Sequence, residues 1–273
     1  MSTRTEQQAK AQRFADLHAS APLILPNAWD AGSARLIAGA GATAIATTSG
    51  GHSWSLGLPD GGHLSREQAI ELVARVVATV DVPVSADIET GYGDSLTELS
   101  ATVEAVLQAG AVGLNIEDSG QDPLYDIEAM AERIAAVRQS ADRYGVPLFI
   151  NARTDVVLFG SGTLEEIMAR AKAYAQAGAD GIFVPGLLDL DALRTLAAAT
   201  SLPVNVMIVP GAPSVAELVA AGVTRISAGT ALTQSVYAHT QRAAREMLTD
   251  GTYTALAETI GYGDLNTEFS VSR

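Results

Sequence analysis

The sequence predicts a single (β/α)8 barrel of the TIM type over residues 1–273, with one helix before the first strand and further helices after the last. Three observations predict this fold class. Short β-rich segments alternate with helical segments, the length suits eight such units, and no linker or change in composition divides the chain. An open doubly wound sheet is the main alternative, but no G-x-G-x-x-G motif follows the first expected strand.

The expected elements follow in order from the N-terminus. The segment MSTRTEQQAKAQRFADLHAS predicts an amphipathic helix, and LILPNAW supplies the first strand. Four segments then share one pattern, a helix end, a glycine and a strand apolar on both faces; they begin at Ala40, Ala109, Ala177 and Ala221. Proline opens the three strands between them, over 82–89, 146–154 and 202–209.

Helical segments follow the strands, and the tail continues beyond them. Apolar residues recur with a period near 3.6 in REQAIELVARVVATV and LTELSATVEAVLQAG, for example. The tail from Thr230 to Arg273 is too long for one closing helix. We therefore expect its extra helices to pack on a neighbouring subunit.

Composition excludes several classes of function. Lys plus Arg number 17 and Asp plus Glu 31, and this net charge of −14 without a basic stripe argues against a nucleic-acid partner. No apolar run approaches the roughly 20 residues of a membrane span, and the N-terminus lacks a signal-peptide core, so we expect a soluble, cytoplasmic protein. The absence of cysteine excludes disulfides, cysteine-ligated metals and thiol nucleophiles. The only lysines, Lys10 and Lys172, lie in helical segments, which argues against Schiff-base chemistry.

Acidic residues lie at or after the carboxyl ends of three predicted strands, where a barrel of this type carries its active-site side chains. Asp87 and Glu89 are two apart in SADIETGYGD and should point to one side of their strand, Glu117 lies in LNIEDSG, and Asp60 lies in the loop GLPDGG. Converging interior carboxylates are costly unless a cation neutralises them, and oxygen ligands without Cys or a His pair select Mg²⁺ or Mn²⁺. The sequence therefore predicts a metal site. Alternatively, each carboxylate caps a helix or pairs with an arginine.

Further polar groups are expected beside these acids. Arg153 in NARTD has a guanidinium suited to binding a carboxylate or phosphate, although it could also serve as an internal counter-ion for Glu117 or Asp87. In the segment TTSGGHSWSLG, the backbone N–H groups of Ser49, Gly50 and Gly51 could bind an oxyanion. A Gly-Gly pair also occurs in plain turns.

The order of these motifs resembles the isocitrate lyase and phosphoenolpyruvate mutase superfamily. SGG, a loop Asp, D-x-E-T-G-Y-G, N-I-E-D and N-A-R-T follow one another within about residues 20–240. The resemblance implies a (β/α)8 barrel whose eighth helix is exchanged between partners, usually in a dimer of dimers. It also implies cleavage or formation of C–C or P–C bonds next to a 2-oxo or enolate carboxylate, with Mg²⁺ holding the oxyanion.

The resemblance also implies a role for each matching residue. Asp87 matches the direct metal ligand, and Glu89, where many relatives have Asp, matches an acid that holds the metal directly or through water. Arg153 matches the arginine that binds the substrate. Glu117 and Asp60 match further acids that hold the metal directly or through water. Ser49, Gly50 and Gly51 match the segment that binds the substrate's carboxylate.

The sequence departs from the family at three strand ends. Isocitrate and methylisocitrate lyases carry a K-x-C-G-H-type loop after the fourth strand, and phosphonate-forming mutases an E-D-K loop, whereas this chain reads DSGQDPLYD. The sixth strand ends on Val184, Pro185 and Gly186. The seventh offers Met207 and Asn205, the latter a candidate substrate-binding residue. We expect a more apolar pocket on this side, which disfavours tricarboxylate substrates.

These features predict a Mg²⁺-dependent lyase, decarboxylase or hydrolase that cleaves a C–C bond in a small 2-oxo or 2-hydroxy carboxylic acid. The alternatives are a P–C mutase or hydrolase for a phosphonopyruvate-like substrate, and a non-catalytic barrel that binds a carboxylate. Besides water, the candidate proton donors are Tyr92, Tyr125 and His52. The loop from Ser119 to Tyr125 is short, so we expect an open site in which water takes part.

Overall fold

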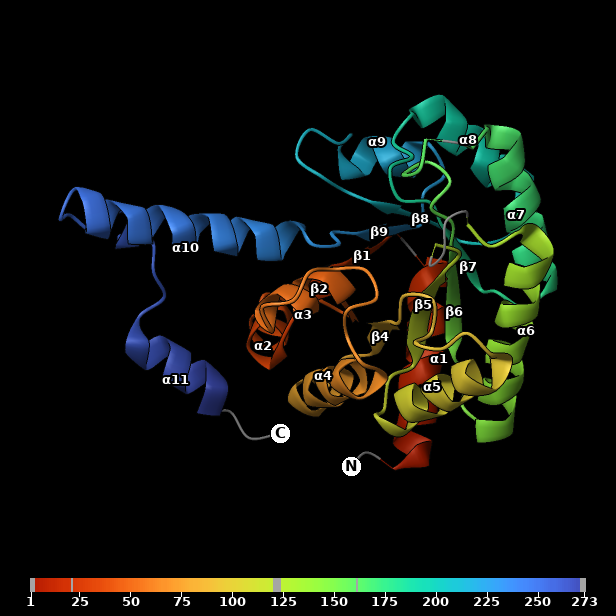
Figure 1. The fold of residues 1–273 in the computed structure, drawn as a ribbon, viewed down its shortest axis with the longest axis horizontal. Coiled ribbons are helices and arrows are strands. Elements are labelled where there is room, and N and C mark those ends of the chain that lie inside the picture. The colour runs from red at the N-terminus through yellow and green to blue at the C-terminus, as the bar shows by residue number, and fades with distance from the viewer. Residues whose placement is uncertain (1–2, 21, 120–123, 161, 271–273) are drawn as a thin grey trace.

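The structure is a computed structural model that describes residues 3–20, 22–119, 124–160 and 162–270. Parallel strands form its core and helices surround them (Figure 1). The strands are β1 Leu23–Leu25, β2 Asn27–Ala28, β3 Ile45–Thr47, β4 Val84–Asp87, β5 Gly113–Glu117, β6 Phe149–Arg153, β7 Gly181–Phe183, β8 Val204–Met207 and β9 Arg225–Ser227.

Helices precede, separate and follow these strands. The first, α1, spans Arg4–Ser20, as the amphipathic N-terminal segment predicts. The others are α2 Ala31–Gly39, α3 Ser49–Ser55, α4 Arg66–Thr79, α5 Leu96–Gln108, α6 Ile127–Tyr144, α7 Leu164–Gln176, α8 Leu190–Ala199, α9 Val215–Ala220, α10 Ala231–Thr249, the 3-10 helix η1 Thr254–Leu256 and α11 Tyr262–Ser270. No helix among these described segments is both long and apolar enough to cross a bilayer.

The strand pairing confirms the predicted (β/α)8 barrel. The order in the sheet is β1-β9-β8-β7-β6-β5-β4-β3-β2. Because β1 and β2 are consecutive in the chain, the pairing of β1 with β9 and of β2 with β3 closes the sheet. The first predicted strand is divided at Pro26, which has no N–H to donate to a neighbouring strand.

One end of the barrel is covered by α1. Phe14 is fully buried, with its ring edge-on to that of Phe149 at the start of β6 and 5.6 Å from it. His18 stacks on the same ring at 3.8 Å. Since α1 covers the end where the strands begin, the carboxyl ends of the strands are left for the chemistry, as in other barrels of this kind.

The four glycines of the repeated pattern end their helices as predicted. Each has a positive φ, where a residue with a Cβ is strained. Gly222 is also confined, because a Cβ there would lie 2.6 Å from the Cβ of Ala197 on α8. The φ values are 99° at Gly41, 95° at Gly110, 103° at Gly178 and 89° at Gly222.

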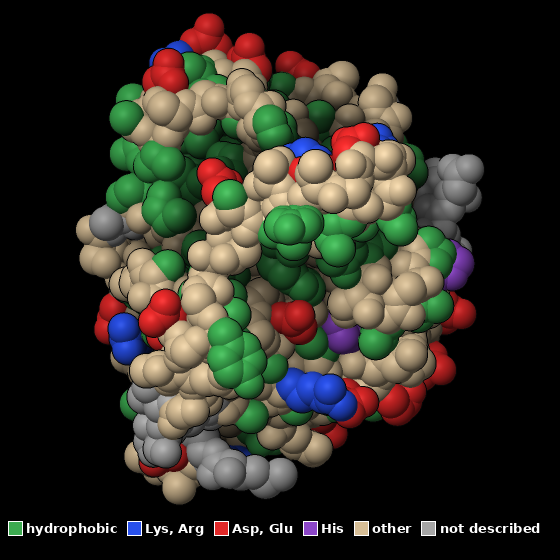
Figure 2. Space-filling view, turned by 90° about the vertical axis from the view of Figure 1, so that its left-hand side faces the viewer, with side chains coloured by type: hydrophobic (Ala, Val, Ile, Leu, Met, Phe, Trp, Pro, Cys, Tyr) green, Lys and Arg blue, Asp and Glu red, His purple; other side chains and the backbone are tan. Residues whose placement is uncertain are grey.

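The predicted helices after the last strand are present, and α10 projects away from the barrel (Figure 1). The chain then returns, and α11 contacts α2 through an ion pair between Glu268 and Arg35 at 3.1 Å. Leu248 near the end of α10 is 86% exposed and Tyr262 at the start of α11 is 87% exposed. Figure 2 shows that hydrophobic side chains gather on this side of the molecule.

Candidate active site

Asp87 lies at the carboxyl end of β4, where two groups fix it. Its N–H donates to Oγ1 of Thr47 at 2.8 Å, and its Oδ2 accepts the N–H of Ser49 at 3.0 Å. Its Oδ1 is buried and has no hydrogen-bond partner among the residues described. One oxygen of this carboxylate therefore lacks the donor or cation that a buried oxygen requires.

Glu89 lies in the turn that follows β4 and not in the strand itself. β4 ends at Asp87, and Glu89 and Tyr92 have φ values of 50° and 53°, which are uncommon for residues other than glycine. The Glu89 carboxylate accepts the N–H of Gly62 at 2.6 Å and the hydroxyl of Tyr92 at 3.2 Å. Strand alternation, from which the sequence analysis placed Glu89, is therefore not what brings it to the site.

The segment Ser49, Gly50 and Gly51 forms the first turn of α3, and there is no room on it for larger side chains. A Cβ on Gly50 would lie 2.7 Å from Oδ2 of Asp60, and one on Gly51 would lie 2.5 Å from Oγ1 of Thr233. The close approach of Asp60 therefore requires glycine. This also places the Asp60 carboxylate against the helix turn whose first N–H binds Asp87.

Burial first, and then the charges of neighbouring acids, raises the pKa of three acidic groups of the site. Burial, followed by the charge of Asp87, raises the pKa of Asp60, and burial together with Asp87 and Asp60 raises the pKa of Glu89. Burial raises the pKa of Glu117 to about 8, against the lowering effect of Arg153 and with a further contribution from Asp87. Burial and the neighbouring Glu89 raise the pKa of Tyr92, so its hydroxyl stays protonated. These acids therefore converge on Asp87, and a cation there would relieve their repulsion.

These side chains suit an ion held largely through water. Within the described ranges, no three His, Asp or Glu side chains come close enough together to ligate one ion directly. Mg²⁺ keeps several waters and is usually bound by one or two carboxylates, so this spacing is compatible with it. The unpartnered Oδ1 of Asp87 is the oxygen best placed to be a direct ligand.

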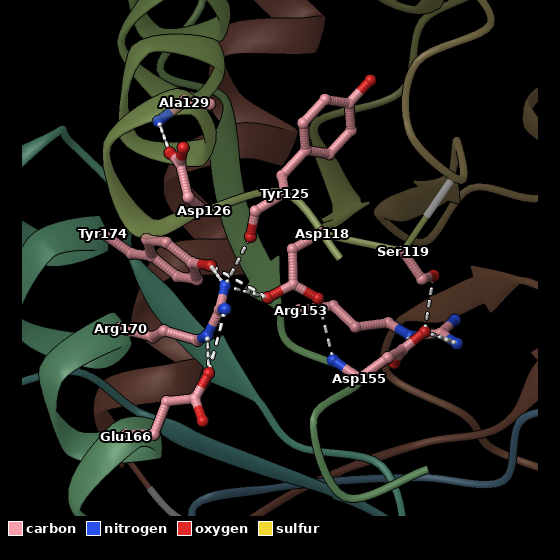
Figure 3. A network of polar contacts seen from close by, with 10 residues as sticks. All are labelled: Asp118, Ser119, Tyr125, Asp126, Ala129, Arg153, Asp155, Glu166, Arg170 and Tyr174. Carbon is pink, nitrogen blue, oxygen red and sulfur yellow. Dashed lines mark hydrogen bonds and ion pairs between the residues drawn. The ribbon is translucent and has the colours of Figure 1, made fainter. Parts of the chain in front are cut away.

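Arg153, at the end of β6, is bound on two sides, and Figure 3 shows the side that faces Asp155. Its Nη1 lies 2.8 Å from Oε2 of Glu117, which fits the counter-ion alternative for that residue. Its Nε and Nη2 lie 2.6 and 2.8 Å from the two oxygens of Asp155. The Ser119 Oγ lies 2.8 Å from Glu117 and 2.7 Å from Asp155. The sequence analysis did not single out Asp155, although it is the last residue of the NARTD motif.

The two acids of the IED motif, Glu117 and Asp118, contact different groups. Asp118 is fully buried and faces α7, where its Oδ2 accepts from Nη1 of Arg170 and from the hydroxyl of Tyr174, both at 2.9 Å. Its Oδ1 accepts the N–H of Asp155 at 2.9 Å. Only Glu117 of the pair therefore takes part in the acidic site.

Asn205 and His52 are not brought to the acids. Asn205 is fully buried inside the barrel, where its Oδ1 accepts from Asn151 at 2.9 Å and its Nδ2 donates to Val206 O at 2.7 Å. His52 lines a separate cavity of about 390 Å³ between α2, α3 and α4. Burial lowers its pKa, and its Nε2 lies 3.3 Å from the carbonyl of Gln68.

Tyr125 is held at the edge of the site by contacts on both its ring and its backbone. The Arg133 guanidinium lies over the ring, 4.9 Å from its centroid, and Arg170 donates to the Tyr125 carbonyl at 3.0 Å. In Figure 3 the ring points away from Arg153. Most of the loop expected to be short and open, residues 120–123, lies outside the residues described.

Known proteins resemble this chain in sequence and in fold. Residues 14–248 match the family model of phosphoenolpyruvate phosphomutase. An uncharacterized protein of Mycobacterium tuberculosis (strain ATCC 25618 / H37Rv) is 41% identical over 79% of this chain and 81% of its own. The 2-methylisocitrate lyase of Salmonella typhimurium (strain LT2) is 32% identical over 67% of this chain and 64% of its own. A crystal structure from Burkholderia cenocepacia J2315, provisionally assigned as a lyase/mutase, has a TM-score of 0.93 at 39% identity over 98% of each chain. The chain is therefore an enzyme of the phosphoenolpyruvate mutase and isocitrate lyase superfamily.

Proposed function

We propose that this enzyme depends on Mg²⁺ and breaks a C–C bond in a small 2-oxo or 2-hydroxy carboxylic acid. The observation that carries the proposal is the buried Oδ1 of Asp87, which has no partner in the described part of the chain and belongs to a cluster of acids in which Asp87 raises the pKa of Asp60, Glu89 and Glu117. Such a cluster is costly in a protein interior unless a cation neutralises it. The similarity to a 2-methylisocitrate lyase supports lyase chemistry.

Four side chains would hold the ion. Asp87 would be the direct ligand, and Asp60, Glu89 and Glu117 would bind its waters. When bound, Mg²⁺ supplies a positive charge that stabilises the negative charge developing on a substrate oxygen as the C–C bond breaks.

Arg153 and the first turn of α3 would bind the substrate. A guanidinium has five N–H groups; on Arg153, Nε and Nη2 each donate one to Asp155, and Nη1 forms an ion pair with Glu117. One N–H on each of Nη1 and Nη2 is left for a carboxylate of the substrate. The backbone N–H groups of Gly50 and Gly51 would receive a second oxyanion, since glycine has no side chain of its own to keep a ligand from the backbone.

Tyr92 is the strongest of the three side-chain candidates for proton donor. Its hydroxyl donates to Glu89, one of the four proposed metal-site acids, at 3.2 Å. His52 faces another cavity, and the ring of Tyr125 points away from Arg153. Water remains the other source of the proton, as we expect for a decarboxylase or hydrolase.

Product release from a panel of acids tests the proposal. Oxaloacetate, substituted malates and phosphonopyruvate are incubated with the protein, with Mg²⁺ and with EDTA, and pyruvate, oxalate, carbon dioxide and phosphate are measured. We expect Mg²⁺-dependent cleavage of a C–C bond in at least one compound. Turnover of phosphonopyruvate alone would favour P–C chemistry, and turnover that persists in EDTA would contradict the metal requirement.

We also propose that a second copy of the chain covers the apolar side from which α10 projects. A groove of about 760 Å³ there is lined mainly by apolar residues. Exposed apolar side chains on α10, such as Val236 and Met247, are 45% and 52% exposed. A helix of this kind from another copy has the chemistry to fill the groove, which supports association of the chain with a second copy.

A further inference from the structure

Asp155 fixes the plane of the Arg153 guanidinium. Its two oxygens accept from Nε and Nη2 of Arg153 at 2.6 and 2.8 Å, a bidentate arrangement in which the guanidinium cannot rotate without breaking a bond. Glu117 forms an ion pair with Nη1 at 2.8 Å, which does not fix the plane of the guanidinium as two parallel hydrogen bonds do. Asp155 therefore determines where the remaining N–H groups of Arg153 point.

Asp155 is itself held in place by a hydrogen bond from its backbone N–H to Asp118, as Figure 3 shows. It is 2% exposed, and its N–H donates to Oδ1 of Asp118 at 2.9 Å. Asp118 is in turn held at 2.9 Å by both Arg170 and Tyr174 of α7. A continuous series of hydrogen bonds thus runs from the helical layer, through Asp118 and Asp155, to Arg153 at the mouth of the barrel.

We propose that Asp155 is a positioning residue for substrate binding, which holds Arg153 so that its free N–H groups on Nη1 and Nη2 meet the substrate's carboxylate. Asp118 supports this orientation through the backbone of Asp155. The inference rests on the proposed function, because it assumes that Arg153 binds a carboxylate. It adds that the acid two residues after the arginine, and not the metal-site acid Glu117, sets the geometry of that contact.

Oxalate, a small dicarboxylate that resembles the enolate of a 2-oxo acid, is a suitable probe. Its affinity is measured by calorimetry in the presence of Mg²⁺ for the wild type and for Asp155→Asn. The amide is close in size to the carboxylate but presents one acceptor oxygen, so the bidentate pair is lost. We expect oxalate to bind at least about tenfold more weakly.

A matched control is Asp180→Asn. Asp180 also pairs with an arginine, Arg138, and accepts the N–H of Ile150 at 2.8 Å, but it lies at the opposite end of the barrel, before β7. We expect this variant to bind oxalate as the wild type does. Asp155→Glu, which keeps the charge but displaces the carboxylate, is the second variant if the asparagine variant does not fold, and it should also bind oxalate more weakly.

The Nε–H signal of Arg153 in a ¹⁵N spectrum gives a readout independent of activity. It is assigned from its loss in Arg153→Lys. We expect it to move in Asp155→Asn and to stay in place in Asp180→Asn.

The outcomes are distinguishable. A wild type that does not bind oxalate would overturn the proposed function and this inference together. A wild type that binds it, with an Asp155→Asn variant of equal affinity or with an unmoved Arg153 signal, would overturn the positioning role alone.

Discussion

Asp87 is the residue on which the proposed metal site depends, since among the four acids, all of them described, it alone has a buried oxygen with no hydrogen-bond partner. Asp87→Asn should lower the affinity for Mg²⁺ at least about tenfold, because the direct ligand loses its charge while the shape of the side chain is kept. Calorimetric titration with Mg²⁺ measures this. Asp180→Asn is the control, and equal Mg²⁺ affinity in Asp87→Asn and the wild type would contradict the assignment.

Glu117 should make Mg²⁺ binding depend on pH. The pKa of Glu117 in the metal-free protein is raised to about 8, so the side chain carries a proton at neutral pH that the bound metal must displace. The affinity for Mg²⁺ should therefore rise between about pH 6 and pH 8, by up to about tenfold per unit. Titrations in buffers of different ionisation enthalpy would also detect the released proton. In Glu117→Gln the rise should be smaller, and an equally steep rise in that variant would assign it to other groups.

At the scale of single residues, the sequence predicts which side chains carry charge but not which way they face. Asp87, Glu89 and Glu117 stand at or just after the carboxyl ends of neighbouring barrel strands, and Asp60 follows α3, so that Asp87 raises the pKa of the other three acids. His52 does not join them, since it stands on a side of the short helix α3 that faces another cavity. The sequence around His52 did not predict this helix, so it gave no helical periodicity from which the direction of the His52 side chain could be inferred.

At the scale of elements, the strands and the helix ends were predictable, whereas the turn after β4 was not. Alternating apolar segments with a glycine at φ near 90° recur along the chain, and such a repeat can be read directly from the sequence. The left-handed turn at Glu89 and Tyr92 depends on contacts from distant elements. Arg133 on α6, for example, donates to the carbonyls of Thr90 and Gly93.

The glycines that end helices should differ in how well they tolerate a side chain. Gly222→Ala should destabilise the protein by at least about 3 kcal/mol, because it adds a clash 2.6 Å from the Cβ of Ala197 to the strain of a positive φ. Gly41→Ala is the matched control. It has the same kind of backbone and nothing within 4 Å of the added Cβ, so it should cost about 1 kcal/mol. Urea unfolding measures both, and equal losses would contradict the packing argument.

At the scale of the whole molecule, the contact of α1 with the barrel should weaken in acid. Burial, followed by the charge of Arg225, lowers the pKa of His18 from 6.5 to about 3. The unfolded chain therefore binds a proton near pH 6.5 that the folded protein does not bind until about pH 3. As pH falls through this window, His18 reduces the free energy of unfolding by up to about 1.4 kcal/mol per pH unit.

A comparison with His18→Gln isolates this effect. Glu117 acts in the opposite direction over the same range, since its raised pKa makes the folded protein the form that keeps the proton. The difference between wild type and variant cancels that contribution. Between pH 6.5 and pH 5 the wild type should lose up to about 2 kcal/mol of unfolding free energy relative to His18→Gln. Parallel urea-midpoint curves for the two proteins would contradict a neutral, buried His18.

The exposed apolar side of the molecule leads to the last prediction, which concerns assembly. Leu36 on α2 is 38% exposed and lines the groove of about 760 Å³, together with Ile24 and Leu232. If α10 of a second copy fills this groove, a charge at Leu36 would have to be buried without a partner, which is costly. Light scattering should therefore give the wild type a mass that is a multiple of 28.2 kDa and Leu36→Glu a smaller one. Leu96→Glu is the matched control, because Leu96 begins α5 on another side of the barrel and is similarly exposed, at 42%. A monomeric wild type, or equal masses for Leu36→Glu and the wild type, would contradict the proposed interface.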